Sequence, residues 1–324
     1  MMAFIPYAMQ IIMSFLFIAM MFWMVPRASV SAARINQVLE SEDSVKDPEK
    51  PHSFAGKPVG RTIEFKDVCF RYGGAAEDVL HNISFTAKPG QTTAFIGSTG
   101  SGKSTLVNLI PRFYDVTGGA ITIDGTDVRA VTQHELRDNV GYVPQKGLLF
   151  SGTIDSNLKL GDEAASGGDI RKAAEVAQAT EFIDQLDSGF ESAISQGGTN
   201  VSGGQRQRLS IARALVKKPP IYIFDDSFSA LDFATDARLR AALGPYNGGA
   251  TVLIVAQRVS TIMHAEQHVV LDEGKVVGTG TDEDLRNNCE TYGEIAESQL
   301  SQDELAGAKK IPSSPAAAPG GAAR

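Results

Sequence analysis

Residues 97–105 read Gly97-Ser98-Thr99-Gly100-Ser101-Gly102-Lys103-Ser104-Thr105. The stretch matches the pattern G-x-x-x-x-G-K-[ST], in which a glycine-rich loop surrounds the phosphates of a nucleotide. Residues 92–96 before it predict a short strand, and residues 104–110 predict a helix, which is the context that the pattern requires. A glycine-rich turn that binds nothing is the alternative, but chance gives such a match in only roughly one or two per cent of chains this long.

The chemistry of this loop predicts ATP and Mg²⁺ as ligands. Its glycines allow backbone N–H groups to curl around phosphate oxygens, and the start of the following helix adds partial positive charge. Lys103 is long enough to reach the β- and γ-phosphates, and the Ser104 hydroxyl is a ligand for Mg²⁺.

A second metal ligand is expected at Asp225, which follows the four hydrophobic residues 221–224. Proteins with this loop hold Mg²⁺ with a carboxylate at the end of a buried strand, directly or through water. A solvated aspartate at a strand end is the plainer alternative, but the phosphate loop favours the metal site.

The rest of the chain predicts an α/β fold. Short apolar or alternating runs predict strands, and longer periodic stretches predict helices. Because strands and helices alternate, we expect a mostly parallel sheet covered on both faces. The predicted strands are 63–70, 92–96, 120–123, 140–143, 221–224, 251–255 and 268–271, and the predicted helices are 104–110, 170–179, 204–215 and 234–243.

One further motif narrows the family. Val201-Ser202-Gly203-Gly204-Gln205 resembles the LSGGQ signature of ABC transporters, with valine for leucine, and precedes Asp225 by about 20 residues. Backbone amides at the start of a helix can bind a γ-phosphate. In that family the phosphate belongs to ATP on another subunit, so the resemblance implies a head-to-tail dimer with two nucleotides at the interface.

Other residues match the family in its order, over about residues 60–300. The resemblance implies a P-loop NTPase cassette, with a RecA-like core and a helical subdomain at about residues 150–218. Residues 149–154 resemble the exporter members. The individual matches are Tyr72 for the aromatic that stacks on adenine, Gln145 for the glutamine that contacts Mg²⁺ and faces the membrane domain, and Ser229-Ala230-Leu231-Asp232 for the loop that links the two sites across the dimer.

Two positions depart from the family pattern. Asp226 stands where the family has the glutamate that polarises water, and Gln257 replaces its switch histidine. With Gln145, these are the expected catalytic residues. Aspartate is shorter by one methylene, and misplacement by about 1 Å can cost on the order of a hundredfold in rate. Glutamine can hydrogen-bond a γ-phosphate but carries no charge.

Both departures fall in the chain's own site, whereas the signature is nearly intact. This asymmetry resembles the degenerate subunit of a heterodimeric exporter, whose partner is a different chain with glutamate and histidine in place. Two alternatives stay open: a homodimer in which Asp226 is an adequate base, and an ATP-gated clamp that drives no transport.

The first forty residues predict a membrane helix. Residues 3–25 are almost wholly apolar and would span ~34 Å as a helix, enough for a hydrocarbon core of about 30 Å. Arg27 and Arg34 follow, which places the cassette in the cytoplasm at the cell membrane. A signal peptide is the competing interpretation, but no Lys or Arg precedes the apolar run.

The domain prediction is a transmembrane helix with its extension at 1–40, a linker at 41–60, the cassette at 61–300 and a disordered tail at 301–324. One helix cannot form a transport pathway, so further transmembrane helices are expected as partners. A formal charge of -8 argues against nucleic acid as a partner. The two cysteines, Cys69 and Cys289, show no disulfide or metal-binding pattern.

Overall fold

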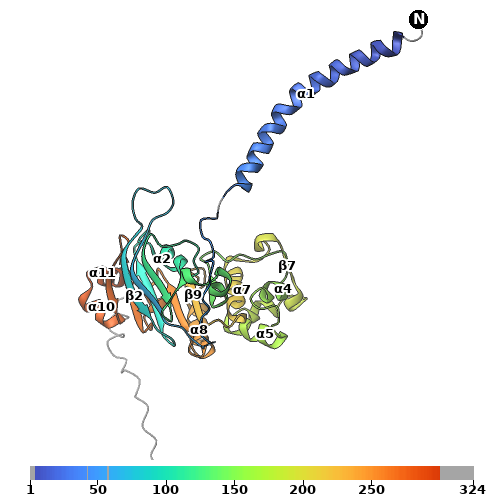
Figure 1. Ribbon diagram of the computed structural model, residues 1–324. Helices are drawn as coiled ribbons and strands as arrows, with labels where there is room; N and C mark the ends of the chain where they lie inside the picture. The colour runs from blue at the N-terminus through green and yellow to red at the C-terminus, as the bar shows by residue number, and fades with distance from the viewer. Residues whose placement is uncertain (1–3, 42, 57, 300–324) are drawn as a thin grey trace, which may run out of the picture. The chain divides into compact units, whose positions relative to one another are not determined.

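The computed structural model describes residues 4–299 apart from 42 and 57, and the tail predicted at 301–324 lies outside the described residues. The chain forms two compact units, residues 1–46 and 47–324. In the first, α1 (Phe4–Leu39) is a helix of 36 residues in which no side chain is buried (Figure 1). It is long and apolar enough to cross a membrane, a test that a signal sequence also passes.

The second unit begins within the stretch that the sequence predicted to be a linker. Phe54 is buried, its N–H donates to the Glu135 carboxylate at 2.7 Å, and the Arg61 guanidinium lies 4.8 Å from its ring centre. The N–H of His52 donates to the Ala130 carbonyl at 2.7 Å. Part of the predicted linker therefore lies against the cassette.

The main sheet of the cassette has six strands. All neighbouring strands are parallel except β12 and β11, which are antiparallel. The carboxyl ends of β3, β9 and β10 therefore meet at one edge, as in other parallel sheets whose ligands bind there. The strand order is β12 (Lys275–Gly280), β11 (Gln267–Asp272), β3 (Thr92–Gly97), β10 (Thr251–Val255), β9 (Ile221–Asp225) and β6 (Val140–Val143).

A second, antiparallel sheet and a small two-stranded sheet complete the β-structure. Apolar side chains of the antiparallel sheet pack with those of β3, α2 and alternate residues of β9, β10 and β11 in one buried cluster. This sheet runs in the order β2 (Leu80–Ala87), β1 (Ile63–Phe70), β4 (Gly118–Ile123) and β5 (Thr126–Asp127), and the small sheet pairs β7 (Gly152–Thr153) with β8 (Ala193–Ile194).

The helices confirm the predicted core and helical subdomain. Figure 1 shows α4, α5, α7 and β7 together on one side of the sheets. The helices are α2 (Lys103–Leu109), α3 (Gln133–Asp138), α4 (Ile154–Lys159), α5 (Gly167–Val176), α6 (Thr180–Ile183), α7 (Gly203–Val216), α8 (Phe233–Asn247), α9 (Val259–Ile262), α10 (Asp282–Asn288) and α11 (Glu290–Gln299).

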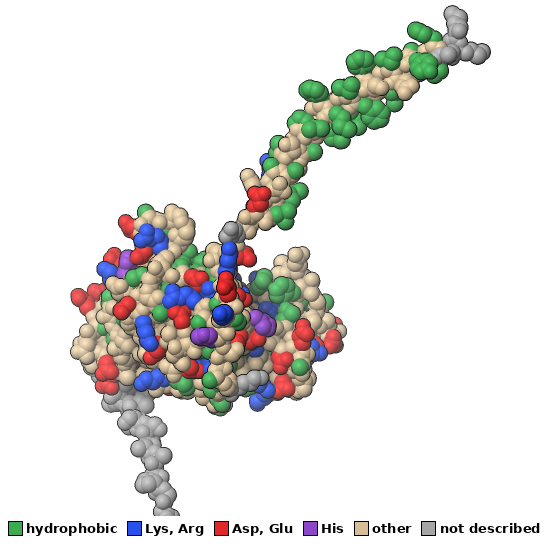
Figure 2. All heavy atoms as spheres, in the orientation of Figure 1, with side chains coloured by type: hydrophobic (Ala, Val, Ile, Leu, Met, Phe, Trp, Pro, Cys, Tyr) green, Lys and Arg blue, Asp and Glu red, His purple; other side chains and the backbone are tan. Residues whose placement is uncertain are grey.

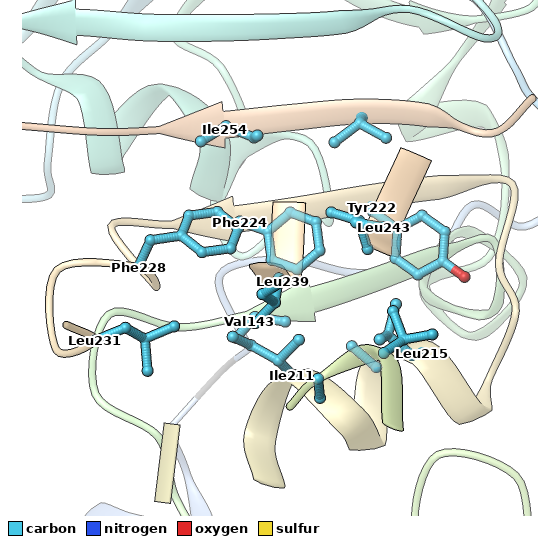
Figure 3. Packing of buried hydrophobic residues seen from close by; sticks show 14 of the residues in the cluster. Val143, Ile211, Leu215, Tyr222, Phe224, Phe228, Leu231, Leu239, Leu243 and Ile254 are labelled. Carbon is cyan, nitrogen blue, oxygen red and sulfur yellow. The ribbon is translucent and has the colours of Figure 1, made fainter. Parts of the chain in front are cut away.

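A continuous apolar cluster joins the helical subdomain to the sheet (Figure 3). Ile211 and Leu215 of α7 are fully buried beside Phe224 of β9 and Leu239 of α8. A buried leucine or isoleucine contributes about 2–5 kcal/mol against truncation to alanine. This packing fixes α7, and with it the position of the motif at its start.

Candidate nucleotide site

The backbone of the phosphate loop is one that only glycine adopts without strain. Gly102 has a φ of 95°, and a Cβ there would lie 2.7 Å from a methyl carbon of Leu80. A Cβ on Gly97 would lie 1.9 Å from the Leu271 carbonyl oxygen. The loop therefore runs tightly between β3 and α2, as in glycine-rich loops whose backbone amides surround an anion.

Lys103 lies inside this loop. Its ammonium donates to the carbonyl oxygens of Gly97 at 2.9 Å and Ser98 at 2.7 Å, and the side chain is buried. Burial lowers the pKa of Lys103, and the nearby carboxylates of Asp226 and Asp225 oppose that shift. The cation is thus desolvated and close to the place where phosphate charge would arrive.

A cavity of about 240 Å³ opens above the loop and brings together residues from five segments of the chain. Six of the ten predicted ATP-binding residues share it with all three expected catalytic side chains. The other four, Tyr72, Gly97, Ser98 and Ser101, do not line it. Its lining consists of Val79, Thr99, Gly100, Gly102, Lys103, Ser104, Thr105, Gln145, Asp226, Val255 and Gln257.

The donor set beside the loop fits Mg²⁺. The Ser104 hydroxyl donates to Asp225 at 2.8 Å, so two of the three predicted ligands are adjacent. The side-chain amide of the third, Gln145, donates instead to Asp226 at 3.0 Å. Among the described residues no three His, Cys, Asp or Glu side chains form a metal cluster. Mg²⁺ commonly takes one or two protein ligands and completes its shell with phosphate oxygens and water. Ser104 and Asp225 would hold the ion, and it would neutralise charge on the phosphates.

Burial makes the ionised form of Asp225 unfavourable. Burial raises the pKa of this carboxyl, and the neighbouring Asp226 adds to the rise, while hydrogen bonds from Ser104 and Tyr142 oppose it. The ionised group therefore costs folding free energy at neutral pH, and the cost disappears where the carboxyl is protonated.

We expect Asp225→Asn to stabilise the nucleotide-free cassette at neutral pH. The pKa of Asp225 is higher in the folded state than in the unfolded state. The protonated carboxyl therefore contributes fully to stability below its unfolded pKa, and this contribution is lost as pH rises through the folded pKa. The free energy of unfolding gained by the substitution should therefore be larger at pH 8 than at pH 4. Urea unfolding at both pH values checks this, and an equal gain at both would contradict it.

The carboxylate of Asp226 is held between two amides. Gln145 and Gln257 each donate to Oδ2, at 3.0 and 2.7 Å. Asp226 follows β9 with a φ of 48°, and its N–H donates to the Val255 carbonyl at 3.0 Å. The parallel pairing of β9 with β10 on one side and with β6 on the other thus brings these three side chains together from distant parts of the chain.

Tyr72 lies at the edge of the loop. Its hydroxyl is 3.0 Å from the Thr105 hydroxyl, and its ring meets the rings of Phe70 and Tyr114 edge to face. This places an aromatic ring next to the first turn of α2, where a nucleotide base could stack.

The motif at residues 201–205 forms the exposed start of α7. Ser202 and Gln205 make a capping box: the Ser202 hydroxyl accepts from the Gln205 N–H at 3.2 Å, and the Gln205 side chain accepts from the Ser202 N–H at 2.9 Å. Gly204 lies against the Ala230 carbonyl. None of these residues lines the cavity above the loop.

The neighbouring loop at residues 229–232 is also positioned by helix capping. Asp232 accepts from the Thr235 N–H at 2.9 Å at the start of α8, and Leu231 is buried in the core. Ser229 donates to the Asp226 carbonyl at 2.8 Å, so the loop is bonded directly to the residue in the cavity.

One side chain near the predicted metal ligands was not singled out from the sequence. Tyr142, at the end of β6, donates to Asn108 at 2.8 Å and to Asp225 at 3.3 Å. Burial raises its pKa. It stands three residues before Gln145, and a tyrosine at the end of a buried strand was the available signal.

Known proteins resemble the chain in sequence and in structure. A family model described as ABC transporter matches residues 80–229. An uncharacterised ABC transporter ATP-binding protein of Mycobacterium tuberculosis is 48% identical over 300 residues, or 92% of this chain and 51% of that protein. A beta-(1→2)glucan export ATP-binding/permease protein of Rhodopseudomonas palustris is 43% identical over 269 residues, or 83% and 44%.

A solved structure of a bacterial Atm1-family ABC exporter with ATP bound superposes with a TM-score of 0.79 at 34% identity, over 86% of this chain and 48% of that one. The chain thus spans about half the length of the relatives it matches. The phosphate loop, the strand-end carboxylates and these likenesses agree: the chain carries an ABC transporter ATP-binding domain, the ATPase module of that family.

Proposed function

We propose that this chain is the ATP-binding subunit of an exporter, in which closure of a cassette dimer on ATP drives movement of substrate across the cell membrane. The single observation that carries the proposal is the exposed capping box at Ser202. It lies at a helix start fixed by core packing yet outside the chain's own phosphate cavity. A second cassette can present its ATP to this surface without rearrangement of α7.

At its own site the chain would bind ATP between Tyr72 and the loop and would hydrolyse it slowly. The Oδ2 atom of Asp226 already accepts two amide N–H groups. An attacking water must compete with those amides, and the shorter side chain must reach it across one methylene less. The partner would be a different chain that carries the glutamate and histidine.

The membrane partner would dock beside Gln145. A groove of about 290 Å³ lies between the core and the helical subdomain, and Pro144 and Leu148 help to line it. Leu148 and Phe150 are each more than half exposed. Figure 2 shows hydrophobic side chains gathered on the face of the helical subdomain. A helix end from the transmembrane domain would cover this surface, and the cassette would lie in the cytoplasm.

The decisive experiment measures ATP turnover of the purified pair after the partner's general-base glutamate is removed. We expect turnover to fall to near background, because the site on this chain contributes little. Near-normal hydrolysis in that mutant would refute the slow-site proposal. If the chain alone already hydrolyses ATP at an exporter-like rate, the homodimer alternative replaces it.

The double substitution Asp226→Glu with Gln257→His should raise hydrolysis at this chain's own site by about tenfold or more. Glutamate reaches the water with one more methylene, and histidine can carry positive charge near the γ-phosphate. Single-turnover hydrolysis of ATP held by the chain measures the effect. Gln257→His alone is the matched control, since it leaves the short carboxylate in place and should recover little activity.

A further inference from the structure

Gln299, the last residue of α11, reaches the segment that carries Gln257. Its side-chain N–H₂ donates to the Gln257 carbonyl at 2.8 Å, and its side-chain oxygen accepts from the Val259 N–H at 2.9 Å. One amide therefore satisfies two backbone groups on either side of Arg258. Gln299 belongs to none of the motifs described above and has no part in the proposed function.

The segment depends on this contact because α9 is short. Val259 is its first residue, and the first N–H groups of a helix have no partner within the helix. Arg258, which precedes it, makes no capping hydrogen bond with its side chain in the described structure. Its guanidinium lies instead over the Phe233 ring, 4.8 Å from the centre. Gln299 thus supplies from another helix the cap that α9 lacks.

The helix that carries Gln299 is firmly packed. Tyr292 is fully buried and meets the ring of His268 edge to face, and its hydroxyl donates to Asp282. Ala296, one turn before Gln299, is buried as well. Gln299 therefore extends from a fixed helix and can hold the Gln257 backbone in place.

The opposite end of Gln257 faces the cavity. Its side-chain amide donates to Asp226 at 2.7 Å and lines the cavity above the phosphate loop. The reach of this amide is set by the position of its own backbone, which Gln299 holds.

We propose that Gln299 is a positioning residue for the nucleotide site: it fixes the backbone of Gln257 so that the Gln257 amide meets the γ-phosphate of ATP. The inference rests on the proposed binding of ATP by this chain. ADP lacks the phosphate that Gln257 would contact. This role of Gln299 would therefore make the discrimination between ATP and ADP depend on the packing of the C-terminal helix α11.

The test compares Gln299→Leu with the matched control Ser298→Ala in the full chain. The Ser298 hydroxyl bonds only to the Ile295 carbonyl in its own helix among the described residues. Two quantities are measured: hydrogen exchange at the Val259 amide, and the affinities for Mg·ATP and Mg·ADP. Because Gln299 is exposed, the leucine variant should fold, and its thermal midpoint should lie within a few degrees of that of the control, the effect of one lost helix cap.

In Gln299→Leu we expect exchange at Val259 to accelerate about fivefold or more and ATP affinity to fall about three- to tenfold, which is the effect of one or two hydrogen bonds. ADP affinity should stay unchanged. A merely structural role would lower both affinities together, and that result would overturn the inference. Exchange at Val259 equal to that of the control would overturn it as well.

The failure of the proposed function has a different signature. A wild-type chain that does not bind Mg·ATP refutes that proposal, and this inference with it. Normal ATP binding in both the wild type and Gln299→Leu refutes the role of Gln299 alone.

Discussion

Lys103→Met should lower the affinity of the cassette for Mg·ATP by at least about a hundredfold. The Lys103 ammonium would donate charge-assisted hydrogen bonds to phosphate, which are stronger than those from neutral backbone amides. Inside a water-excluded cavity these bonds gain further strength. Methionine fills a similar volume but has neither the charge nor the N–H donors. The loss should therefore fall on nucleotide binding more than on packing.

Equilibrium titration of the purified chain with a fluorescent ATP analogue measures this effect. Lys88→Met is the matched control, because Lys88 is exposed and outside the cavity. Its affinity should equal that of the wild type. Retention of wild-type affinity in Lys103→Met would show that the loop does not hold the nucleotide through this side chain.

Gly203→Asp should lower ATP hydrolysis at the partner's nucleotide site in the assembled dimer by about a hundredfold or more, without unfolding the chain. A Cβ on Gly203 would meet nothing within 4 Å, so the structure has room for the new side chain. A carboxylate in the first turn of α7 also stabilises the helix through its dipole. The same charge would repel a γ-phosphate placed there by the partner.

Steady-state ATP turnover of the assembled dimer, with nucleotide binding to this chain measured in parallel, separates the two sites. Binding to this chain's own loop should persist. Gly203→Asn is the matched control, since it has nearly the same shape without the charge and should keep much more of the turnover. Equal inhibition by both variants would point to steric blockage and against an anion site.

The sequence predicted those elements of the fold whose side chains repeat regularly. Strands at 92–96, 221–224 and 251–255 are short apolar runs, and they form β3, β9 and β10. The strand β2 was missed. Asn82 has a φ of 48°, and the register with β1 shifts there, so its alternation of buried and exposed residues is broken. Edge strand β12 buries no residue fully, which left no apolar signal.

Most residues that line the cavity could be named from the sequence, but their arrangement could not. The loop at 97–105 is recognisable from the sequence, because its glycines and Lys103 must stand at fixed spacings within one short stretch to enclose phosphate. The shared contact of Gln145 and Gln257 with one oxygen of Asp226 depends on tertiary packing, which no local pattern encodes. Gln299 was also invisible, since a lone glutamine near the end of a helix has no distinctive chemistry.

The pairing of β9 with β10 fixes the distance along the sheet between the residues that follow each strand. Val255 stands opposite Asp225, so Asp226 and Gln257 each follow their strand by a fixed number of residues. Exchanging a side chain at either position alters the chemistry of the cavity and leaves the strand register unchanged. Adding or deleting a single residue within either strand would turn the side chains that follow to the opposite face of the sheet. Substitutions can therefore alter this candidate site in small steps, whereas a change of strand length would disrupt it at once.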